Sequence, residues 1–338
     1  MGSKRVDRSH LLARAALVGV ALSVVLVALS QALGVDSYAL PLVLGAAFTA
    51  KVHLSSTYAA VRGMAWVIAW MFGAALLGGL VCTWGSSELV IVATVGLVGG
   101  YAGVLGARGA LISVLAMEVY TVFAGLEISP STAAKFAALL AGGGVIYLLV
   151  VTVPVPFHTP QGVVDRAEHP GPWLHRLDLR NPLCTPFGRH AMRLSITLVV
   201  GTAISHQVGW EHAYWIPMTI VLVSKPDSNG TATRIVERIL GTLLGVGIAV
   251  LLFVVAGDGP VMVSLYAGVG VFLTLTFTRA NYALSVTGIT IVLMTLLILV
   301  GDPIVATDAS RVVSTVIGGV ITITATLTLW RRQPAGFS

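Results

Sequence analysis

The sequence alternates between long apolar runs and short polar connections from one end to the other. No run alternates strictly between apolar and polar positions. A membrane-spanning segment has to satisfy its backbone polar groups internally, so we expect helices. Most runs approach or exceed the ~20 residues that a bilayer helix needs. Twelve runs can be marked, six on each side of a polar linker, at Leu11–Leu33, Tyr38–Ala50, Gly63–Thr83, Leu89–Leu105, Ala110–Leu126, Ala133–Val153, Leu194–Val208, Ala213–Val223, Ile239–Ala256, Val261–Thr278, Ala283–Val300 and Val312–Trp330.

Composition agrees with a membrane location. Of the 338 residues, 56% are hydrophobic and only 10% are charged, whereas a soluble domain carries ~25% charged residues. Lys4, Arg5 and Arg8 precede the first apolar run, as basic residues do in a signal peptide. We interpret that run as a membrane span, because the second half of the chain contains its counterpart.

The basic residues predict an orientation. When the twelve runs are threaded from a cytoplasmic N-terminus, 18 of the 20 Lys and Arg fall on the cytoplasmic side, and Lys135 and Arg311 are the exceptions. Both termini are then cytoplasmic, in a multi-pass protein of the cytoplasmic (plasma) membrane. The net charge of +6 follows from this topology, so we expect no nucleic-acid partner. Cys82 and Cys184 lie near opposite membrane faces, which excludes a disulfide bond between them.

The two halves of the chain show an internal repeat. Tyr38–Pro41 and Tyr214–Pro217 share a Tyr-x-x-Pro pattern and lie 176 positions apart (214 − 38). The same offset places Arg62 under Arg238 and Gly142-Gly143 under Gly318-Gly319. An even number of spans gives both copies the same orientation, which is one of the standard transporter designs.

This repeat predicts an all-α integral membrane protein of about twelve transmembrane helices, arranged as two six-helix parallel repeats. We expect the first repeat at residues 1–153, a cytoplasmic proline-rich linker at 154–188 and the second repeat at 189–338. The linker holds seven of the fourteen prolines of the chain. A homo-oligomer is possible, and the sequence leaves this open.

The second span of each half is short and has a proline near its start, Pro41 or Pro217. Short or proline-interrupted segments at matching positions are the best sequence pointer to a transporter's binding site. A tilted, partly buried helix that tolerates a proline in its first turn explains the same pattern.

Arginines mark one helical face after the second of these segments. Arg234, Arg238, Gly241 and Gly245 stand at i, i+4, i+7 and i+11, so cations come first and small residues follow. Guanidinium groups recognise carboxylates in a planar, forked geometry, which suggests a binding site for organic anions. Arg62 holds the matching place in the first half. The alternative is that these arginines only anchor the helix ends at the membrane surface.

Two further sets of residues are candidates. Glu118 stands midway along the fifth run with no cation within a turn, and an acid at that depth is by default a functional hypothesis, here for proton coupling. Arg279, Asn281 and Tyr282 open the eleventh run, where Asn281 and Tyr282 either donate to an anionic ligand or cap and anchor the helix. The sequence shows no paired-carboxylate, nucleophile–base, metal-ligand or phosphate-loop pattern, so we expect no enzyme and no cofactor.

Several segments together resemble the fusaric acid resistance family of bacterial membrane proteins, which includes aromatic acid exporters and is distantly similar to plant aluminium-activated malate channels. The resemblance covers about 189–332 and rests on the runs YWIPMTIVLV, TRIVERILGTLLG, RANYALSV and RVVSTVIGG. It implies six-helix modules that pair around a path for organic anions. It also implies that Arg234, Arg238, Gly241, Arg279, Asn281 and Tyr282 line that path.

The leading hypothesis is a carrier that exports small organic or aromatic acid anions, with cytoplasmic arginines that collect the anion and Glu118 that couples protons. A passive anion channel would use the same arginines without a coupling acid. A membrane scaffold that transports nothing would need the arginines only for topology.

Overall fold

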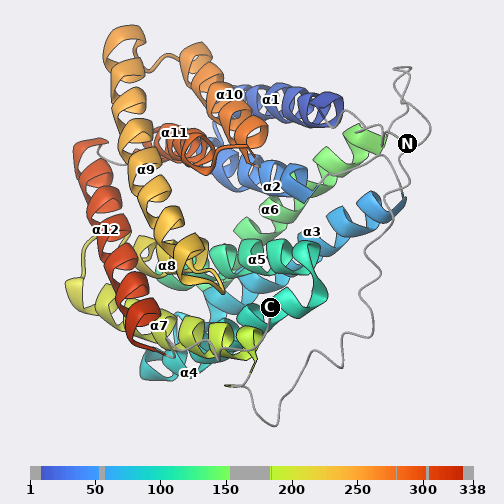
Figure 1. The fold of residues 1–338 in the computed structure, drawn as a ribbon. Helices are drawn as coiled ribbons and strands as arrows, with labels where there is room; N and C mark the ends of the chain where they lie inside the picture. Colours follow the sequence, from blue (N-terminus) through green and yellow to red (C-terminus); the bar gives the residue numbers. More distant parts are fainter. Residues whose placement is uncertain are drawn as a thin grey trace. The chain divides into compact units, whose positions relative to one another are not determined.

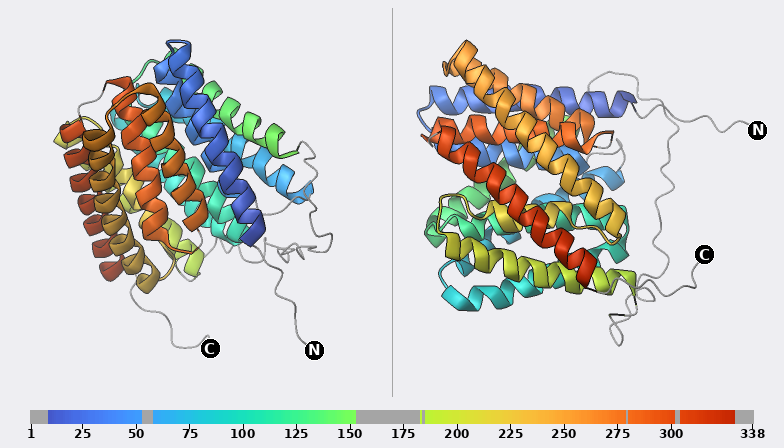
Figure 2. Two further views of the ribbon diagram at one scale, coloured as in Figure 1. Left: turned by 90° about the horizontal axis from the view of Figure 1, so that it is seen from above. Right: turned by 60° about the vertical axis from the view of Figure 1, so that its left-hand side comes forward.

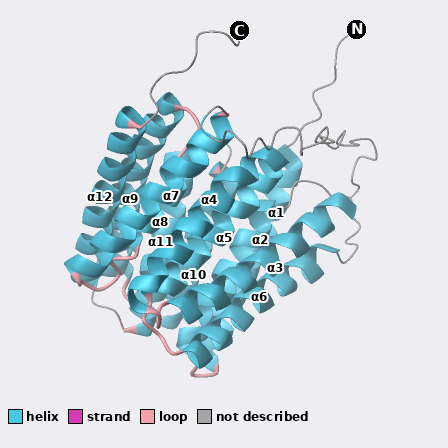
Figure 3. Cartoon of the chain, turned by 90° about the horizontal axis from the view of Figure 1, so that it is seen from below, coloured by secondary structure: helices cyan, strands magenta, loops and turns pink. Residues whose placement is uncertain are grey.

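A computed structural model describes residues 9–52, 58–152, 183, 185–278, 280–301 and 304–329 (Figure 1). Over these residues the elements are helices and turns, and no strand occurs (Figure 3). This confirms the prediction of an all-α protein. The helices are α1 (Ser9–Ala32), η1 (Asp36–Tyr38), α2 (Ala39–Val52), α3 (Tyr58–Val81), η2 (Gly85–Ser87), α4 (Glu88–Tyr101), η3 (Ala102–Leu105), α5 (Ala107–Gly125), α6 (Pro130–Thr152), α7 (Pro186–Val208), α8 (Trp215–Val223), α9 (Ser228–Ala256), α10 (Pro260–Phe277), α11 (Tyr282–Val300) and α12 (Ile304–Thr328).

Local sequence signals explain several helix ends. The Thr185 hydroxyl accepts a hydrogen bond from the Gly188 amide at 3.0 Å, and Pro186 fills the first turn of α7, where no amide hydrogen is needed. α7 and α11 are followed by Gly209 and Gly301, which adopt positive φ values of 60° and 97° that glycine accepts without strain. Residues 154–182 and 184, most of the predicted linker, lie outside the described residues.

The second helix of each half is short, as the sequence predicts. α2 has 14 residues and α8 has 9. Pro41 and Pro217 stand at the third position of their helices, where the missing amide hydrogen breaks no helical bond. The proline pattern therefore has a local structural explanation, and it stays a pointer to a binding site only together with other observations.

Eight of the described helices are long and apolar enough to cross a membrane. They are α3, α4 with η3, α5, α6, α9, α10, α11 and α12. α2 and α8 are too short, and α7 carries Arg189, Arg193 and two histidines. The apolar stretch described for α1 is Ala16–Ala32. The chain is therefore a multi-pass membrane protein.

The helices group into two compact units. Unit 1 consists of residues 1–72, 136–171 and 244–302, and unit 2 of residues 73–135, 172–243 and 303–338. Each unit combines segments from both halves of the sequence, and α3, α6 and α9 each contribute residues to both units. Packing therefore groups the helices differently from their order along the chain.

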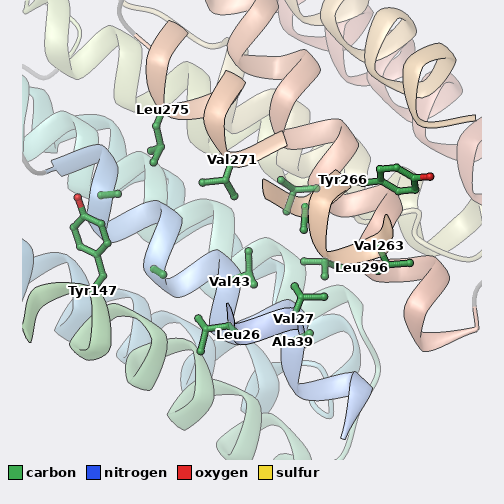
Figure 4. Packing of buried hydrophobic residues seen from close by; sticks show 14 of the residues in the cluster. Leu26, Val27, Ala39, Val43, Tyr147, Val263, Tyr266, Val271, Leu275 and Leu296 are labelled. Carbon is green, nitrogen blue, oxygen red and sulfur yellow. The ribbon is translucent and has the colours of Figure 1, made fainter. Parts of the chain in front are cut away.

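Unit 1 has an apolar core between α1, α2, α10 and α11, with Tyr147 of α6 at its side (Figure 4). Val43 of α2, Val271 of α10 and Leu296 of α11 are fully buried there. The Tyr266 hydroxyl donates hydrogen bonds to the carbonyls of Leu252 and Gly257 at 2.9 and 3.0 Å, so its polar group is satisfied.

Unit 2 has a core between α4, α5, α7 and α8, to which Val92, Tyr120 and Leu198 belong. α4 and α7 lie side by side (Figure 2). They approach so closely that a Cβ atom on Gly100 would lie 2.4 Å from the Ala191 Cα atom. The Ser195 hydroxyl donates to the Ala93 carbonyl at 2.7 Å across the same contact. Small residues thus permit the helix contact, as is common in membranes.

The two units repeat one packing scheme. A shift of 176 moves Ser9–Ala32 to 185–208, and α7 spans Pro186–Val208. The same shift moves α4, Glu88–Tyr101, to 264–277, and α10 ends at Phe277. In unit 1, α1 packs on α10, and in unit 2, α7 packs on α4. Helices at matching positions therefore pair in the same way in both units.

Candidate functional site

Among the side chains that the structure describes, buried charge occurs in only one of the two units. Among the residues whose side chains are described, five charged ones are buried, and all five belong to unit 2. They are Glu88, Glu118, Arg193, Arg238 and Arg311. Charged groups are expensive to bury away from water and in membrane proteins mark functional sites by default.

The structure contains the predicted face of α9, on which arginines are followed by a glycine. Arg234 is half-buried, and Arg238 and Gly241 are buried, in register one above the other along the helix. The opposite side of α9 exposes Val236 and Leu240. Cations and a small residue therefore face the interior of unit 2, while aliphatic side chains face outward.

Arg238 is the most enclosed residue on this face, with 3% of its surface exposed. Its Nε atom is buried and has no hydrogen-bond partner among the described residues. A buried donor without a partner carries its full desolvation cost, and an ionised group makes that cost larger. A carboxylate at this position would accept from the guanidinium and remove the penalty.

The connection between α8 and α9 brings further cations close to this face. The Arg193 Nη2 atom of α7 donates to the carbonyls of Lys225 and Pro226 at 2.6 and 3.4 Å. The Thr231 hydroxyl accepts from the Lys225 amide at 3.1 Å. Arg193 therefore holds the connection in place, and we call Arg193, Lys225, Arg234 and Arg238 the cationic cluster.

The cluster has an excess of positive charge. Burial lowers the pKa of the Lys225 ammonium, the Arg234 charge lowers it further, and Asp227 opposes the shift. The Asp227 carboxylate accepts from the Gly230 amide at 2.5 Å, which caps the start of α9. The acid is thus already engaged by the backbone, and an added anion would relieve the repulsion between cations.

The predicted residues of unit 1 are arranged differently. Arg62 is exposed on α3. The Asn281 side chain accepts from the Leu284 amide at 3.1 Å and caps α11, so the capping role weighed from the sequence is confirmed. Tyr282 is half-buried in the first turn of α11, and Arg279 lies outside the described residues. Among the described side chains of unit 1, no buried cation matches Arg238.

Glu118 is buried in α5, with 5% of its surface exposed. Its Oε2 atom has no hydrogen-bond partner in the described part of the chain. This unsatisfied polar atom agrees with the free-energy cost expected for an acid at this depth. The proton-coupling role stays a prediction.

Two contacts in unit 2 were not predicted from the sequence. The Arg311 guanidinium of α12 lies over the ring of Trp215 in α8, 4.8 Å from its centre. The His206 Nε2 atom at the end of α7 lies 3.3 Å from the Glu88 Oε2 atom at the start of α4. Both join helices that are far apart in sequence, and the only local signal was an ionisable residue beside an apolar run.

Two other kinds of site find no support. An apolar groove of about 360 Å³ in unit 1, between α3 and α6, is lined by alanine and larger apolar side chains such as Ile68 and Leu148, which do not suit an anion. Where the structure describes side chains, no group of three or more His, Cys, Asp or Glu residues could hold a metal ion.

Comparison with known proteins covers the region that contains three of the four residues of the cationic cluster. Residues 196–325 match the sequence model of the fusaric acid resistance protein-like family. This part of the chain is therefore similar to that family. The match includes Lys225, Arg234 and Arg238, and the similarity to plant aluminium-activated malate channels stays a prediction.

Curated relatives agree with a membrane location. The chain is 35% identical over 144 residues to the inner membrane protein YccS of Escherichia coli K12, covering 42% of this chain and 20% of YccS. It is 30% identical over 165 residues to an uncharacterised Synechocystis protein, covering 48% and 22%. YhfK of Escherichia coli K12, also uncharacterised, is 31% identical over 165 residues, covering 47% and 22%. The chain thus spans about a fifth of the length of these relatives, and no solved structure matches it.

Proposed function

We propose that this chain is a carrier that exports small organic or aromatic acid anions from the cytoplasm and is driven by the proton gradient. The match of residues 196–325 to the fusaric acid resistance protein-like family supports transport of an acid. The cationic cluster supplies the binding groups, and Glu118 supplies the coupling acid. Arg279, Asn281 and Tyr282 are secondary candidates, and Asn281 already has a structural role in the helix cap. Arg62 is exposed on α3 and is left out of the proposed site.

The buried Arg238 carries the proposal. A guanidinium that is 3% exposed serves no purpose as an anchor at the membrane surface, because anchoring needs contact with water or headgroups. Gly241, three positions further on, is buried on the same helical face and adds no side chain there. A carboxylate ligand satisfies both charge and hydrogen-bonding geometry there.

The proposal includes the twelve predicted spans with both termini cytoplasmic, in which the short helices α2 and α8 need their flanking residues to complete a crossing. The matching helix bounds at the offset of 176 support two six-helix repeats. Within unit 2, Arg193 and Lys225 meet at one end of α7, and Glu88 meets His206 near the other end. This separation of cations from an acid agrees with an inside-positive orientation.

Efflux from proteoliposomes tests the proposal. The purified protein is reconstituted, loaded with labelled benzoate and followed with and without a pH gradient. We expect efflux that the gradient accelerates, whereas gradient-independent flux would indicate a channel. Arg238→Ala should abolish benzoate flux, and Arg62→Ala is the matched control from unit 1. If both variants and the wild type carry equal flux, the cluster is not an anion site, and if none carries flux above empty vesicles, a scaffold is favoured.

A further inference from the structure

The contact between α4 and α7 ends in an acid–histidine pair. The two helices run antiparallel, because Gly100 lies against Ala191 while Glu88 lies against His206. His206 is 13 positions beyond Arg193 (206 − 193), which is about 20 Å along a helix. The pair therefore occupies the end of this contact opposite to the cationic cluster.

The two partners have unequal access to water. The Glu88 side chain is 4% exposed, whereas the His206 side chain is 47% exposed, with 3.3 Å between Oε2 and Nε2. Histidine is the side chain whose charge changes most readily near neutral pH. The half-exposed imidazole can exchange protons with water at its ring nitrogens, and its Nε2 atom lies beside the buried carboxylate. A proton can therefore pass between solvent and Glu88 through His206.

Other titratable groups surround Glu88 within unit 2. The Glu127 carboxylate, between α5 and α6, is close enough to oppose the negative charge of Glu88. The negative charge of Glu88 also acts on the Cys82 thiol, which follows α3, and on the Tyr120 hydroxyl of α5. His206 is the cationic partner that stabilises the ionised form, so the protonation states of Glu88 and His206 depend on each other.

A purely structural role for the pair is disfavoured by unit 1. At the offset of 176, Glu88 corresponds to Ser264 and His206 to Ser30. Both hydroxyls donate to carbonyls of their own helices, Ser264 to Pro260 at 2.9 Å and Ser30 to Val27 at 2.8 Å. Across the contact, the Ser264 hydroxyl accepts a hydrogen bond from the Gln31 side-chain amide of α1 at 3.5 Å. The matching helices α1 and α10 thus pack together without an ion pair at these positions, so the packing of α4 on α7 does not require one in unit 2.

We propose that Glu88 and His206 form a proton-binding site at the end of unit 2 opposite to the cationic cluster. The imidazolium Nε2–H bond breaks and its proton bonds to the Glu88 Oε2 atom, which leaves a neutral imidazole and a neutral carboxyl group. The imidazole then takes the next proton from water. The use of this proton in transport rests on the proposed function, whereas proton binding itself does not.

Infrared difference spectroscopy of the purified protein tests proton binding without any transport. On acidification, the wild type should gain a carboxylic-acid carbonyl band that Glu88→Gln lacks. The control variant Glu211→Gln, at an exposed acid after α7, should keep this band. His206→Gln should keep the band and move the pH at which it rises, because the cationic partner is lost. A band that titrates identically in the wild type and Glu88→Gln would overturn the proposal.

A transport experiment separates this inference from the proposed function. We expect Glu88→Gln to reduce the gradient-driven part of benzoate efflux to the level without a gradient, with the benzoate KM unchanged. A full gradient effect in Glu88→Gln would refute the coupling part of this inference while the anion site stands. Loss of the anion site would show separately, as equal flux in Arg238→Ala and the wild type.

Discussion

Units 1 and 2 share a packing scheme but differ in their buried charge. Each pairs helices at matching positions, α1 with α10 in unit 1 and α7 with α4 in unit 2. All the buried charged side chains that the structure describes nevertheless lie in unit 2. The comparison shows that the helix contacts themselves do not require these charges.

Individual positions make the difference concrete. At the offset of 176, Glu118 corresponds to Met294, which is buried in α11. Arg193 corresponds to Leu17, which is 65% exposed on α1. Arg238 corresponds to Arg62, which keeps the charge but is exposed. Of these three counterparts only the apolar Met294 is buried, and this asymmetry is why we assign the proposed chemistry to unit 2.

The largest effect is expected from exchanging the residues at the matching positions Glu118 and Met294. Glu118→Met copies the residue of unit 1 and should remove all gradient-driven benzoate efflux while the protein keeps its fold, because the new side chain is apolar. Met294→Glu should destabilise the protein by about 3 kcal/mol, the cost of an ionisable group at mid-membrane. Efflux and thermal unfolding in detergent measure the two effects. A stable, fully coupled Glu118→Met protein would refute the coupling role.

A smaller effect, on stability, should distinguish the α4–α7 contact of unit 2 from the α1–α10 contact of unit 1. Gly100→Ala places a methyl group against the backbone of α7, at 2.4 Å from the Ala191 Cα atom. Gly268→Ala in unit 1 meets the end of the Val24 side chain at 2.7 Å, which can rotate away. Overpacking of a rigid contact costs about 1–3 kcal/mol. Thermal unfolding should therefore show a larger loss for Gly100→Ala, and equal losses would mean that the two contacts are equally adaptable.

The smallest effect concerns pH at the cationic cluster. Burial and Arg234 lower the pKa of Lys225, so its ammonium loses its charge at a lower pH than that of an ordinary lysine. Benzoate affinity should therefore fall by about two- to fivefold as the pH rises into the alkaline range, the effect of one partly screened charge. Lys225→Arg should keep its affinity over the same range. An identical pH profile in both proteins would exclude Lys225 from the binding site.

Local patterns predicted much of the fold. Apolar runs gave the helices, and the spacing of Arg234, Arg238 and Gly241 gave a face that the structure confirms. The short α8 with Pro217 was also evident from the sequence. These features depend on residues within one or two helical turns, where the 3.6-residue period alone determines which side chains share a face.

Contacts between distant helices could not be predicted in this way. Glu88 and His206 are 118 positions apart (206 − 88). Glu88 stands in the polar connection just before the apolar run Leu89–Leu105, yet it is buried. The role of Arg193 depends on where the chain after α8 passes. The composition of the two units from both halves likewise follows from packing, which the order of apolar runs does not determine.

Direct binding of benzoate to purified wild type, Arg238→Met and Arg62→Met tests the central claim, that the anion site lies in unit 2. Calorimetric titration in detergent measures the three affinities at one pH and salt concentration. Loss of a charge-assisted hydrogen bond costs about 1.5–3 kcal/mol, so Arg238→Met should bind benzoate about 10- to 100-fold more weakly, and Arg62→Met should bind like the wild type. Wild-type affinity in Arg238→Met, or an equal loss in both variants, would contradict the claim.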